Sequence, residues 1–437
     1  MLSGPPRRAG RVLPWSVWGL AALFVVYNYV QQVVPGVIAA DLAKAFGVSA
    51  AALGSIAAFY FYAYAALQIP VGLTVDRLGP HRPLVAAVAV AALGSLAFSW
   101  SAGPASAELS RLAIGAGAAF SFIACLKLAS NWFPPGMFAT LAGLTNTAGM
   151  VGAAGGGPPM AALVGVTGWR GAMGLLGGAG LALAAAVAVV VRDRPAGAAP
   201  DARVGAAPSG AGLGREIAAV VSSRQGWINA VYATAVSIVF VAFGALWGTT
   251  YVMKAYGVET MAASAAVSNL FFGAIAGSLF FGWFSDRLRR RRAPMLGAAV
   301  GGMVAMGVVL YLPGLSLGAF KVALFALGFC CSANIISYAV AHDLCPPERA
   351  GLSLGFLNTC YYAGSAVSQP LVGRLLDWHA GARAGAGLAA LTVADFRFAL
   401  ASVLAFLAIS LAAALLLEET HVHATAATAE AAADPAR

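Results

Sequence analysis

Two stretches of the sequence, PVGLTVDRLGPHR at residues 70–82 and FFGWFSDRLRRRR at residues 280–292, share one pattern that decides the predicted fold. Each stretch follows an apolar run and carries a glycine shortly before an Asp-Arg pair. The matching residues lie 210 positions apart along the chain: Gly72, Asp76 and Arg77 in the first stretch, and Gly282, Asp286 and Arg287 in the second. The repetition indicates that the chain contains two related halves.

A second repeat lies farther along each half. LAGLTNTAGMVGAAGGGPP at residues 141–159 matches SLGFLNTCYYAGSAVSQPL at residues 353–371, with an offset of 212 positions that aligns Asn146 with Asn358. Several ordered matches at nearly one offset are the mark of an internal duplication. Because each copy holds an even number of apolar runs, both copies enter a membrane in the same direction, and the duplication is parallel.

The composition is that of a membrane protein. Hydrophobic residues make up 60% and charged residues only 10% of the 437 residues, whereas soluble domains carry about 25% charged residues. A helix needs about 20 largely apolar residues to cross a bilayer, and the 52 glycines suit the close packing of such helices. We predict an all-α membrane protein of twelve transmembrane helices in two parallel-repeat six-helix bundles, with spans near 14–40, 50–72, 83–102, 107–131, 138–165, 171–191, 226–252, 262–284, 294–313, 316–341, 350–375 and 396–417.

One long break separates the two halves. We expect an N-terminal segment at 1–13, a first bundle at 14–191, a linker at 192–225, a second bundle at 226–417 and a disordered tail at 418–437. The linker is rich in Gly, Pro and Ala, which is typical of a flexible connection. Its end, REIAAVVSSR, has the pattern of a short amphipathic helix.

The distribution of Lys and Arg predicts the orientation. Most of these 26 residues lie in the termini, the linker and the loops that follow the second and eighth spans. Short cytoplasmic loops are enriched in Lys and Arg. We therefore predict that both termini and the linker are cytoplasmic in an inner membrane of bacterial type. The net charge of +10 is then a topology signal, and no nucleic-acid partner is expected.

The repeated motif also identifies a family. The pattern G-x-x-x-D-R-x-G after the second span, its copy after the eighth span, the six-plus-six arrangement and the long linker resemble the major facilitator superfamily across residues 14–417. NWFPP at 131–135 and GWR at 168–170 resemble its organic-anion symporter and phagosomal nutrient transporter branches, and the first of these motifs also resembles lysosomal dipeptide transporters. Organic-anion symporters usually carry an arginine in the first helix, where this chain has the uncharged YNYVQQ at 27–32.

The resemblance implies a role for the repeated loop. In the family, this motif latches the cytoplasmic ends of the two halves together in the outward-facing state. We expect the latch to consist of Gly72, Asp76, Arg77, Gly282, Asp286 and Arg287, with the glycines permitting close helix packing. The acidic side chains would pair with nearby arginines and with the positive N-terminus of a facing helix. The alternative is that the arginines only set the topology.

Candidates for proton coupling follow from the same comparison. Arg111 in SRLAIGAGAAF matches the arginine of the family's fourth helix, which is linked to proton transfer, although an interfacial structural role is the alternative. Asp41 and Glu108 lie at helix ends on the outer side and are further candidates. Because no Asp or Glu lies in the middle of a predicted span, we expect weak proton coupling at most, or uniport.

Polar side chains within the spans mark a candidate substrate cavity, because they are costly in lipid and this fold binds substrates near the membrane midplane. Lys127 is the only charge well inside an apolar span, and we expect it to meet a substrate carboxylate or phosphate unless it extends to the membrane surface instead. Bonding to a neighbouring helix is the alternative role for the polar residues. The candidate substrate-binding residues are Asn28, Gln31, Tyr60, Tyr64, Lys127, Trp247, Asn334, Tyr338, Asn358 and Tyr362.

These features favour a secondary transporter that moves a small polar organic solute, such as an amino acid, a short peptide or a carboxylate, by alternating access. A hydrophobic drug exporter is the alternative, supported by the aromatic second span and a partial antiporter motif around Pro158. A receptor that kept this fold without transport is a further alternative. A membrane enzyme would need clustered catalytic groups at membrane depth, and the sequence has neither these nor a nucleotide-binding P-loop. The five cysteines form no CxxC pair, so we expect no metal or other cofactor, and we expect a monomer.

Overall fold

The computed structural model describes residues 9–195, 210–346 and 349–420. Residues 1–8 and 421–437, which hold most of the predicted N-terminal segment and tail, lie outside the described residues. The middle of the predicted linker also lies outside them. Within the described ranges the chain forms helices and no strand, so the predicted all-α fold class is confirmed.

The first half contains seven α-helices and one 3-10 turn in the described residues. Its longest helix, α7, holds two predicted spans, because the backbone at Gly168 takes φ 70° and ψ 167° and turns the chain back. A positive φ favours glycine. The elements are α1 (Ala9–Val37), α2 (Ala39–Phe46), α3 (Ala50–Leu78), α4 (His81–Ser99), α5 (Pro104–Ala118), α6 (Ser121–Trp132), η1 (Pro135–Met137) and α7 (Phe138–Val190).

The end of the linker and the second half are also helical in the described residues. The end of the linker forms α8 (Gly210–Val221), at the position predicted for a short amphipathic helix. The remaining elements are α9 (Arg224–Ile238), the π-helix η2 (Val239–Trp247), α10 (Gly248–Tyr256), α11 (Thr260–Leu288), α12 (Arg292–Tyr311), α13 (Leu317–Cys331), η3 (Ser332–Asn334), α14 (Ile335–Asp343), α15 (Ala350–Ala380), η5 (Gly381–Ala386), η6 (Leu388–Ala390) and α16 (Val393–Leu416).

By length and hydropathy, ten helical segments of the described chain are able to cross a membrane. One of them, Thr140–Val190, contains the turn at Gly168 and accounts for two crossings. The long helix α15 is not among the ten because its sequence is more polar, although it runs beside α3 for much of its length. When Thr140–Val190 is counted as two crossings and α15 is added, the described chain has the predicted twelve membrane-spanning helices.

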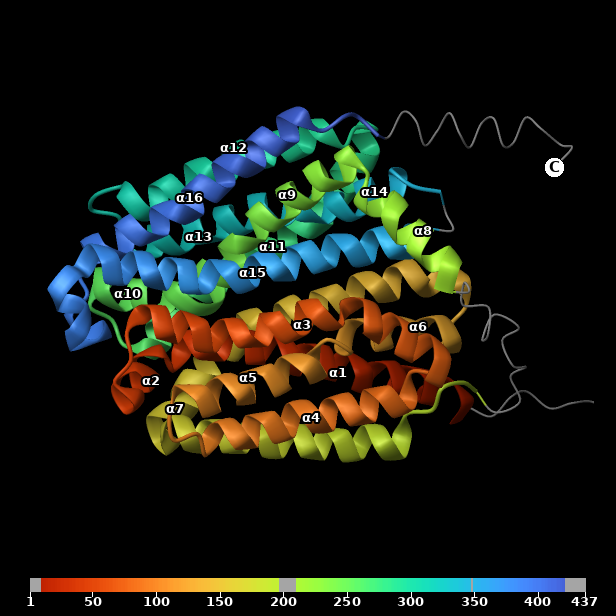
Figure 1. The fold of residues 1–437 in the computed structure, drawn as a ribbon, viewed down its shortest axis with the longest axis horizontal. Helices are drawn as coiled ribbons and strands as arrows, with labels where there is room; N and C mark the ends of the chain where they lie inside the picture. Colours follow the sequence, from red (N-terminus) through yellow and green to blue (C-terminus); the bar gives the residue numbers. More distant parts are fainter. Residues whose placement is uncertain (1–8, 196–209, 347–348, 421–437) are drawn as a thin grey trace, which may run out of the picture.

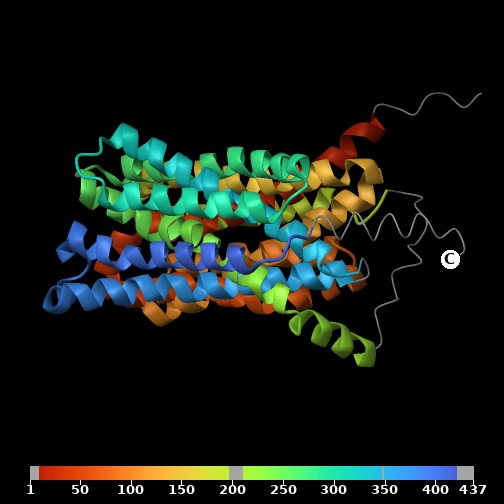
Figure 2. The same ribbon diagram turned by 90° about the horizontal axis from the view of Figure 1, so that it is seen from above.

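The long helices lie side by side along one axis, and the chain has two distinct ends (Figures 1 and 2). We call one the linker end, which holds α8 and the C-terminus of α14, and the other the far end, which holds α2 and α10. The far end is on the left of Figure 1 and the linker end is on the right. Helix α1 begins, and helix α16 ends, at the linker end.

The most extensive contacts between the two halves are α3 with α15, α7 with α11, and α1 with η2. At the far end the contact between α3 and α15 is backbone to backbone. A Cβ atom at Gly54 of α3 would lie 2.6 Å from the carbonyl oxygen of Gln369, and one at Gly373 of α15 would lie 2.4 Å from the carbonyl oxygen of Ala50. No side chain fits in such a space, so glycine is what allows the far end to close tightly.

At the linker end, each half uses an acidic residue in the same way. The Asp193 carboxylate, which follows the sixth span, accepts a hydrogen bond of 2.7 Å from the backbone N–H of His81. The Glu419 carboxylate, which follows the twelfth span, accepts one of 2.6 Å from the backbone N–H of Arg291. In both halves the carboxylate caps the start of the third helix, where unpaired N–H groups favour negative charge. The sequence repeats did not reveal this further sign of duplication.

Candidate functional site

A cavity of about 520 Å³ lies between the two halves and extends from the middle of the helices toward the linker end. Helices α1, α3, α6 and α7 line it from the first half, and α11, α14 and α15 line it from the second half. At its mouth lies His342, whose side chain is 62% exposed. The cavity is therefore open at the linker end and ends blindly toward the far end.

Tyrosines dominate the polar part of the cavity wall. Tyr29 and Tyr64 come from the first half, and Tyr338 and Tyr362 come from the second half. The rings of Tyr64 and Tyr362 lie 4.0 Å apart between their centroids, so this pair bridges the two halves. Beyond them Tyr361 joins the smaller cavity that continues the main one. Phenol groups offer both an aromatic face and a hydrogen-bonding hydroxyl to a bound molecule.

Amide side chains supply the remaining hydrogen-bonding groups. The Tyr338 hydroxyl donates to Asn358 Oδ1 at 2.9 Å across the space between α14 and α15. Asn146, the repeat counterpart of Asn358, lines the same cavity from α7. Asn334 lines the smaller cavity, and its Oδ1 atom is buried without a hydrogen-bond partner. A buried acceptor without a partner costs free energy, so Asn334 Oδ1 is available to a ligand.

Within the described residues, no Lys, Arg, Asp or Glu lines either part of the cavity. His342 at the mouth is the one histidine among the described residues that line the cavity. The cavity wall is therefore neutral, aromatic and rich in amides. Such a wall suits a molecule with a flat apolar face and a few polar groups better than a strongly charged one.

Five of the ten predicted substrate-binding residues line this cavity. They come from three helices and one 3-10 turn that converge on it, and they are Tyr64, Asn334, Tyr338, Asn358 and Tyr362. Tyr29, which was not predicted, lies beside Asn28 in the sequence but faces the cavity. Its position in an aromatic and amide-rich stretch was a signal for it, but the sequence alone did not tell which of the adjacent residues points inward.

Three of the other predicted residues form a buried polar cluster behind the tyrosine pair. Asn28 donates to Ser121 Oγ at 2.9 Å and accepts from the hydroxyl of Tyr60. Gln31 is 0% exposed and donates to the Tyr27 hydroxyl at 2.9 Å. Gln31 also donates to Ser95 of α4. These contacts join α1 to α3, α4 and α6, so in this conformation these residues hold the first half together and do not line the cavity.

Trp247 also lies away from the cavity. Its side chain is 0% exposed, and its indole N–H donates to the carbonyl oxygen of Gln369 at 3.2 Å. Gln369 in turn donates to the carbonyl oxygen of Val241, within the π-helix. A π-helix leaves backbone carbonyls without their usual α-helical partners, and the side chain of Gln369 satisfies one of them. The predicted role of Trp247 in substrate binding therefore has no support in this conformation.

Lys127 does not face the cavity as predicted. Its ammonium group lies 2.6 Å from Asp76 Oδ1, and the two side chains are 30% and 66% exposed. Helix α6 thus directs the lysine toward the linker end, where it neutralises the aspartate of the repeated loop. In this conformation the partner of Asp76 is therefore Lys127 of the same half, and its pairing with an arginine stays a prediction for a conformation in which this end is closed.

The repeated loop has a different arrangement in the second half. Arg291 lies 2.6 Å from Asp286 Oδ1 and 3.2 Å from Asp343 Oδ2, again within one half. A Cβ atom at Gly72 or Gly282 would meet nothing within 4 Å, so the predicted close helix packing at these glycines is absent here. The cause is that the halves are separated at this end by the open cavity.

Arg77 and Arg287, the remaining residues of the predicted latch, are exposed at the linker end. Neither carries an ion pair among the contacts of the described residues. Their participation in a latch stays a prediction for a conformation in which this end is closed.

Arg111 is buried, with a relative exposure of 1%. Its Nη1 atom donates to the carbonyl oxygen of Gln31 at 2.9 Å, and its guanidinium carbon lies 4.9 Å from the centroid of the Tyr60 ring. Its Nε and Nη2 atoms have no hydrogen-bond partner. A buried cation of this kind attracts an anion or an acidic side chain, but the tyrosines separate it from the cavity in this conformation.

The two other candidates for coupling lie near the far end. Glu108 accepts a hydrogen bond of 2.9 Å from Ser55 of α3. Asp41 lines an outer cavity of about 710 Å³ together with Lys44 and Lys254. Partial burial raises the pKa of the Asp41 carboxyl above its ordinary value, and the nearby Lys44 opposes this increase.

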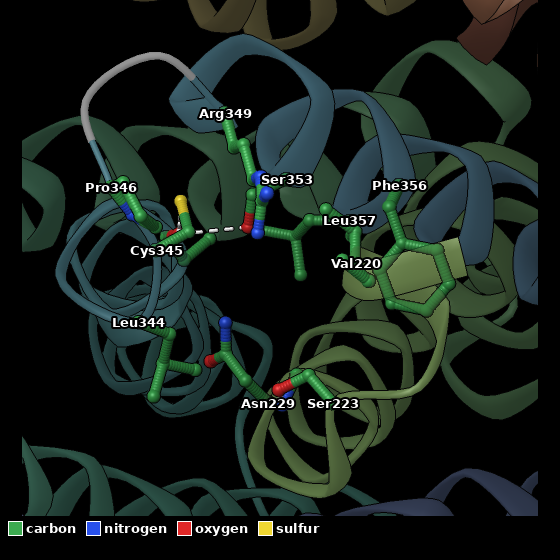
Figure 3. A pocket seen from close by; sticks show the side chains of 13 residues that line it. Val220, Ser223, Asn229, Leu344, Cys345, Pro346, Arg349, Ser353, Phe356 and Leu357 are labelled. Atoms are coloured by element: carbon green, nitrogen blue, oxygen red, sulfur yellow. Dashed lines mark hydrogen bonds between the residues drawn. The ribbon is translucent and has the colours of Figure 1, made fainter. Parts of the chain in front are cut away.

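A further small cavity, of about 80 Å³, lies at the linker end where α8 packs against α9, α14 and α15 (Figure 3). The side chains of Asn229, Cys345 and Ser353 are among those that line it. Arg349 at its edge lies 2.5 Å from Glu216 of α8. This ion pair fastens the end of the linker to the second half, and the cavity is separate from the one between the halves.

Comparison with known proteins agrees with the geometry. The sequence pattern of the Major Facilitator Superfamily matches residues 20–369. The chain belongs to the Major Facilitator Superfamily. It is a membrane transporter of this family, and the family resemblance predicted from the repeated loop is confirmed.

Individual relatives are distant. The chain is 28% identical to the uncharacterized transporter YybO of Bacillus subtilis over 156 residues, which is 36% of each protein. It is 25% identical to the gentisate transporter of Corynebacterium glutamicum over 371 residues, which is 82% of this chain and 80% of that protein. Among solved structures, a bacterial homolog of the human lysosomal transporter Spinster covers 95% of this chain and 98% of its own, with a TM-score of 0.76 at 17% identity. The latter likeness concerns the fold.

Proposed function

We propose that this chain is a secondary transporter that carries a small organic carboxylate by alternating access, with the tyrosine- and amide-lined cavity as its substrate site. The observation that carries the proposal is the cavity itself. It lies between the two halves, opens at one end and is sealed at the other by backbone contacts around Gly54 and Gly373. A site that is accessible from one side at a time is what alternating access requires.

The nature of the wall supports a ring-bearing monocarboxylate rather than a dicarboxylate. Four tyrosines offer ring faces, and Asn146 and Asn358 offer amide groups. Because no cation lines the cavity in the described residues, a negative charge there is held only by neutral hydrogen-bonding groups, and two such charges cost more to desolvate than one. A relative named for gentisate, a hydroxylated aromatic acid, fits this chemistry.

Orientation and coupling complete the proposal. The loops at the linker end contain the repeated arginine-rich motifs, so we place this end in the cytoplasm of a bacterial cell. The cavity of this conformation is then open to the cytoplasm. No carboxylate lines it, so we propose uniport or weak coupling to protons, and monomers suffice because both halves of the site come from one chain.

Uptake into proteoliposomes tests the substrate class. Labelled gentisate should enter vesicles that contain the protein, and unlabelled benzoate should compete with it. Galactarate, which has two charges and no ring, should compete poorly. Transport of galactarate in preference to benzoate would contradict the proposed class, and export of a hydrophobic dye without movement of any acid would favour a drug exporter.

Matched variants test the site. Asn358→Ala should raise KM by about 3- to 10-fold, since a hydrogen bond contributes about 0.5–1.5 kcal/mol. Asn269→Ala is the control, because Asn269 donates only to carbonyl oxygens of its own helix. For the phenols, Tyr338→Phe should raise KM, whereas Tyr232→Phe removes a buried hydrogen bond to the Met295 carbonyl outside the cavity and should leave KM unchanged. Equal effects of variant and control would place the substrate elsewhere.

A further inference from the structure

Helices α3 and α15 are antiparallel neighbours that belong to different halves. At the far end, the last turn of α15 meets the first turn of α3. There the Asp377 carboxylate accepts two hydrogen bonds across the boundary, from the backbone N–H groups of Ala50 at 3.0 Å and Ala51 at 2.8 Å. Both oxygens of the carboxylate are used.

These contacts complete the N-terminus of α3. A helix begins with N–H groups that have no partner within the helix. At the start of α3, Ser49 accepts two hydrogen bonds. Its side-chain oxygen accepts from the backbone N–H of Ala52 at 3.5 Å, and its carbonyl oxygen accepts from the backbone N–H of Leu53 at 3.1 Å. Asp377 of the other half satisfies the remaining two. No Lys or Arg pairs with Asp377 among the described ion pairs, so the positive end of α3 is what compensates its charge.

The same two helices diverge toward the linker end. The main cavity lies between Gln68 of α3 and Asn358 of α15. Asp76, in the last turn of α3, is bound to Lys127 of its own half rather than to α15. The pair of helices is therefore closed at the far end by a carboxylate and open at the other end.

We propose that Asp377 is a gating residue, which holds the far end closed by capping α3 of the opposite half and must release it each time that end opens. The inference rests on the proposed alternating access. In the closed state the cap places the carboxylate against two N–H groups in a partly buried setting. Opening replaces these bonds by water, so the cap favours closure by the amount that a helix N-cap contributes.

Loss of the cap should therefore change the distribution between the two conformations. An N-cap contribution corresponds to about a 2- to 30-fold change in an equilibrium constant. Asp377→Ala should increase the ratio of far-end-open to far-end-closed molecules by this factor. Asp377→Asn keeps an acceptor oxygen and loses the charge, so its effect should be smaller.

Distances between spin labels measure this ratio without any substrate. Labels are attached at Leu109→Cys in the first half and Leu312→Cys in the second, in full-length protein whose native cysteines are replaced. Both positions are exposed near the far end, at 68% and 49%. Glu259→Ala is the matched control, because Glu259 is an exposed far-end carboxylate at the start of α11 that makes no side-chain cap hydrogen bond.

The expected result is a longer label distance in Asp377→Ala, a smaller change in Asp377→Asn and the wild-type distribution in Glu259→Ala. Unchanged distances in Asp377→Ala would overturn the proposal, as would equal changes in all three variants. If Asp377→Ala does not fold, the test rests on Asp377→Asn. A shift of its label distances toward the far-end-open state supports the proposal, and unchanged distances overturn it. Because the measurement needs no transported molecule, an error in the proposed substrate class would leave these distances unaffected.

Discussion

Replacement of Lys127 distinguishes the role predicted from the sequence from the role that the structure gives it. The sequence predicts that this buried-looking lysine binds a substrate carboxylate. In the structure its ammonium group instead lies 2.6 Å from Asp76 at the linker end. The two roles predict effects of different size for the same substitution, Lys127→Ala.

The geometry sets the smaller magnitude. The side chains of Lys127 and Asp76 are 30% and 66% exposed. An exposed ion pair contributes about 0.2–1 kcal/mol, so its loss changes KM by no more than about 5-fold through the conformational equilibrium. A direct hydrogen bond to a substrate carboxylate contributes about 1.5–3 kcal/mol, which would raise KM by about 10- to 150-fold.

A double-mutant cycle separates these cases. KM for the transported acid is measured in proteoliposomes for Lys127→Ala, Asp76→Asn and the combination, with Lys254→Ala as control, since Lys254 bonds only to the Ala389 carbonyl at the far end. We expect each single change to alter KM by less than about 5-fold, and the double variant to resemble either one. If Lys127→Ala raised KM by more than about 10-fold, and the same rise appeared in the Asp76→Asn background, the assignment of Lys127 as the partner of Asp76 would be refuted.

Three further outcomes are expected. Gly373→Ala should shift the label distances toward the far-end-open state, because its Cβ atom would lie 2.4 Å from the Ala50 carbonyl oxygen, and unchanged distances would show that the backbone yields. Asp395→Asn should lower the free energy of unfolding by about 1.5 kcal/mol, because this 0% exposed carboxylate accepts a charge-assisted hydrogen bond of 2.8 Å from the half-exposed Arg383, and an unchanged unfolding temperature would contradict its structural role. Arg111→Met should leave the unfolding temperature nearly unchanged, because a guanidinium with two unpartnered nitrogens is costly to bury, and a large decrease would contradict this cost.

The two-half architecture could be predicted because its signals are local. The pattern around Asp76 recurs around Asp286, and apolar runs of sufficient length predict the membrane-spanning helices. The turn at Gly168 falls between the predicted fifth and sixth spans. Helix α15 is more polar than the other long helices, yet the predicted span at 350–375 lies within it.

The cavity lining was harder to predict, for a geometric reason. Asn28 and Tyr29 are adjacent in the sequence, yet only Tyr29 faces the cavity, while Asn28 bonds Ser121. A helix that is covered by other helices on most sides has no polar face to reveal its rotation. A polar residue within a span therefore has two possible uses, toward a cavity or toward a neighbour, and periodicity does not separate them.

The sequence by itself determined the number of crossings, the duplication and the family, because span length, charge and repeated motifs are properties of contiguous residues. The tertiary structure decided which polar groups share the cavity, that Lys127 binds Asp76, and that Asp377 caps α3 of the other half. These contacts join residues up to hundreds of positions apart. They depend on how each helix is rotated and on which end of the two halves is closed, and no local pattern in the chain encodes that choice.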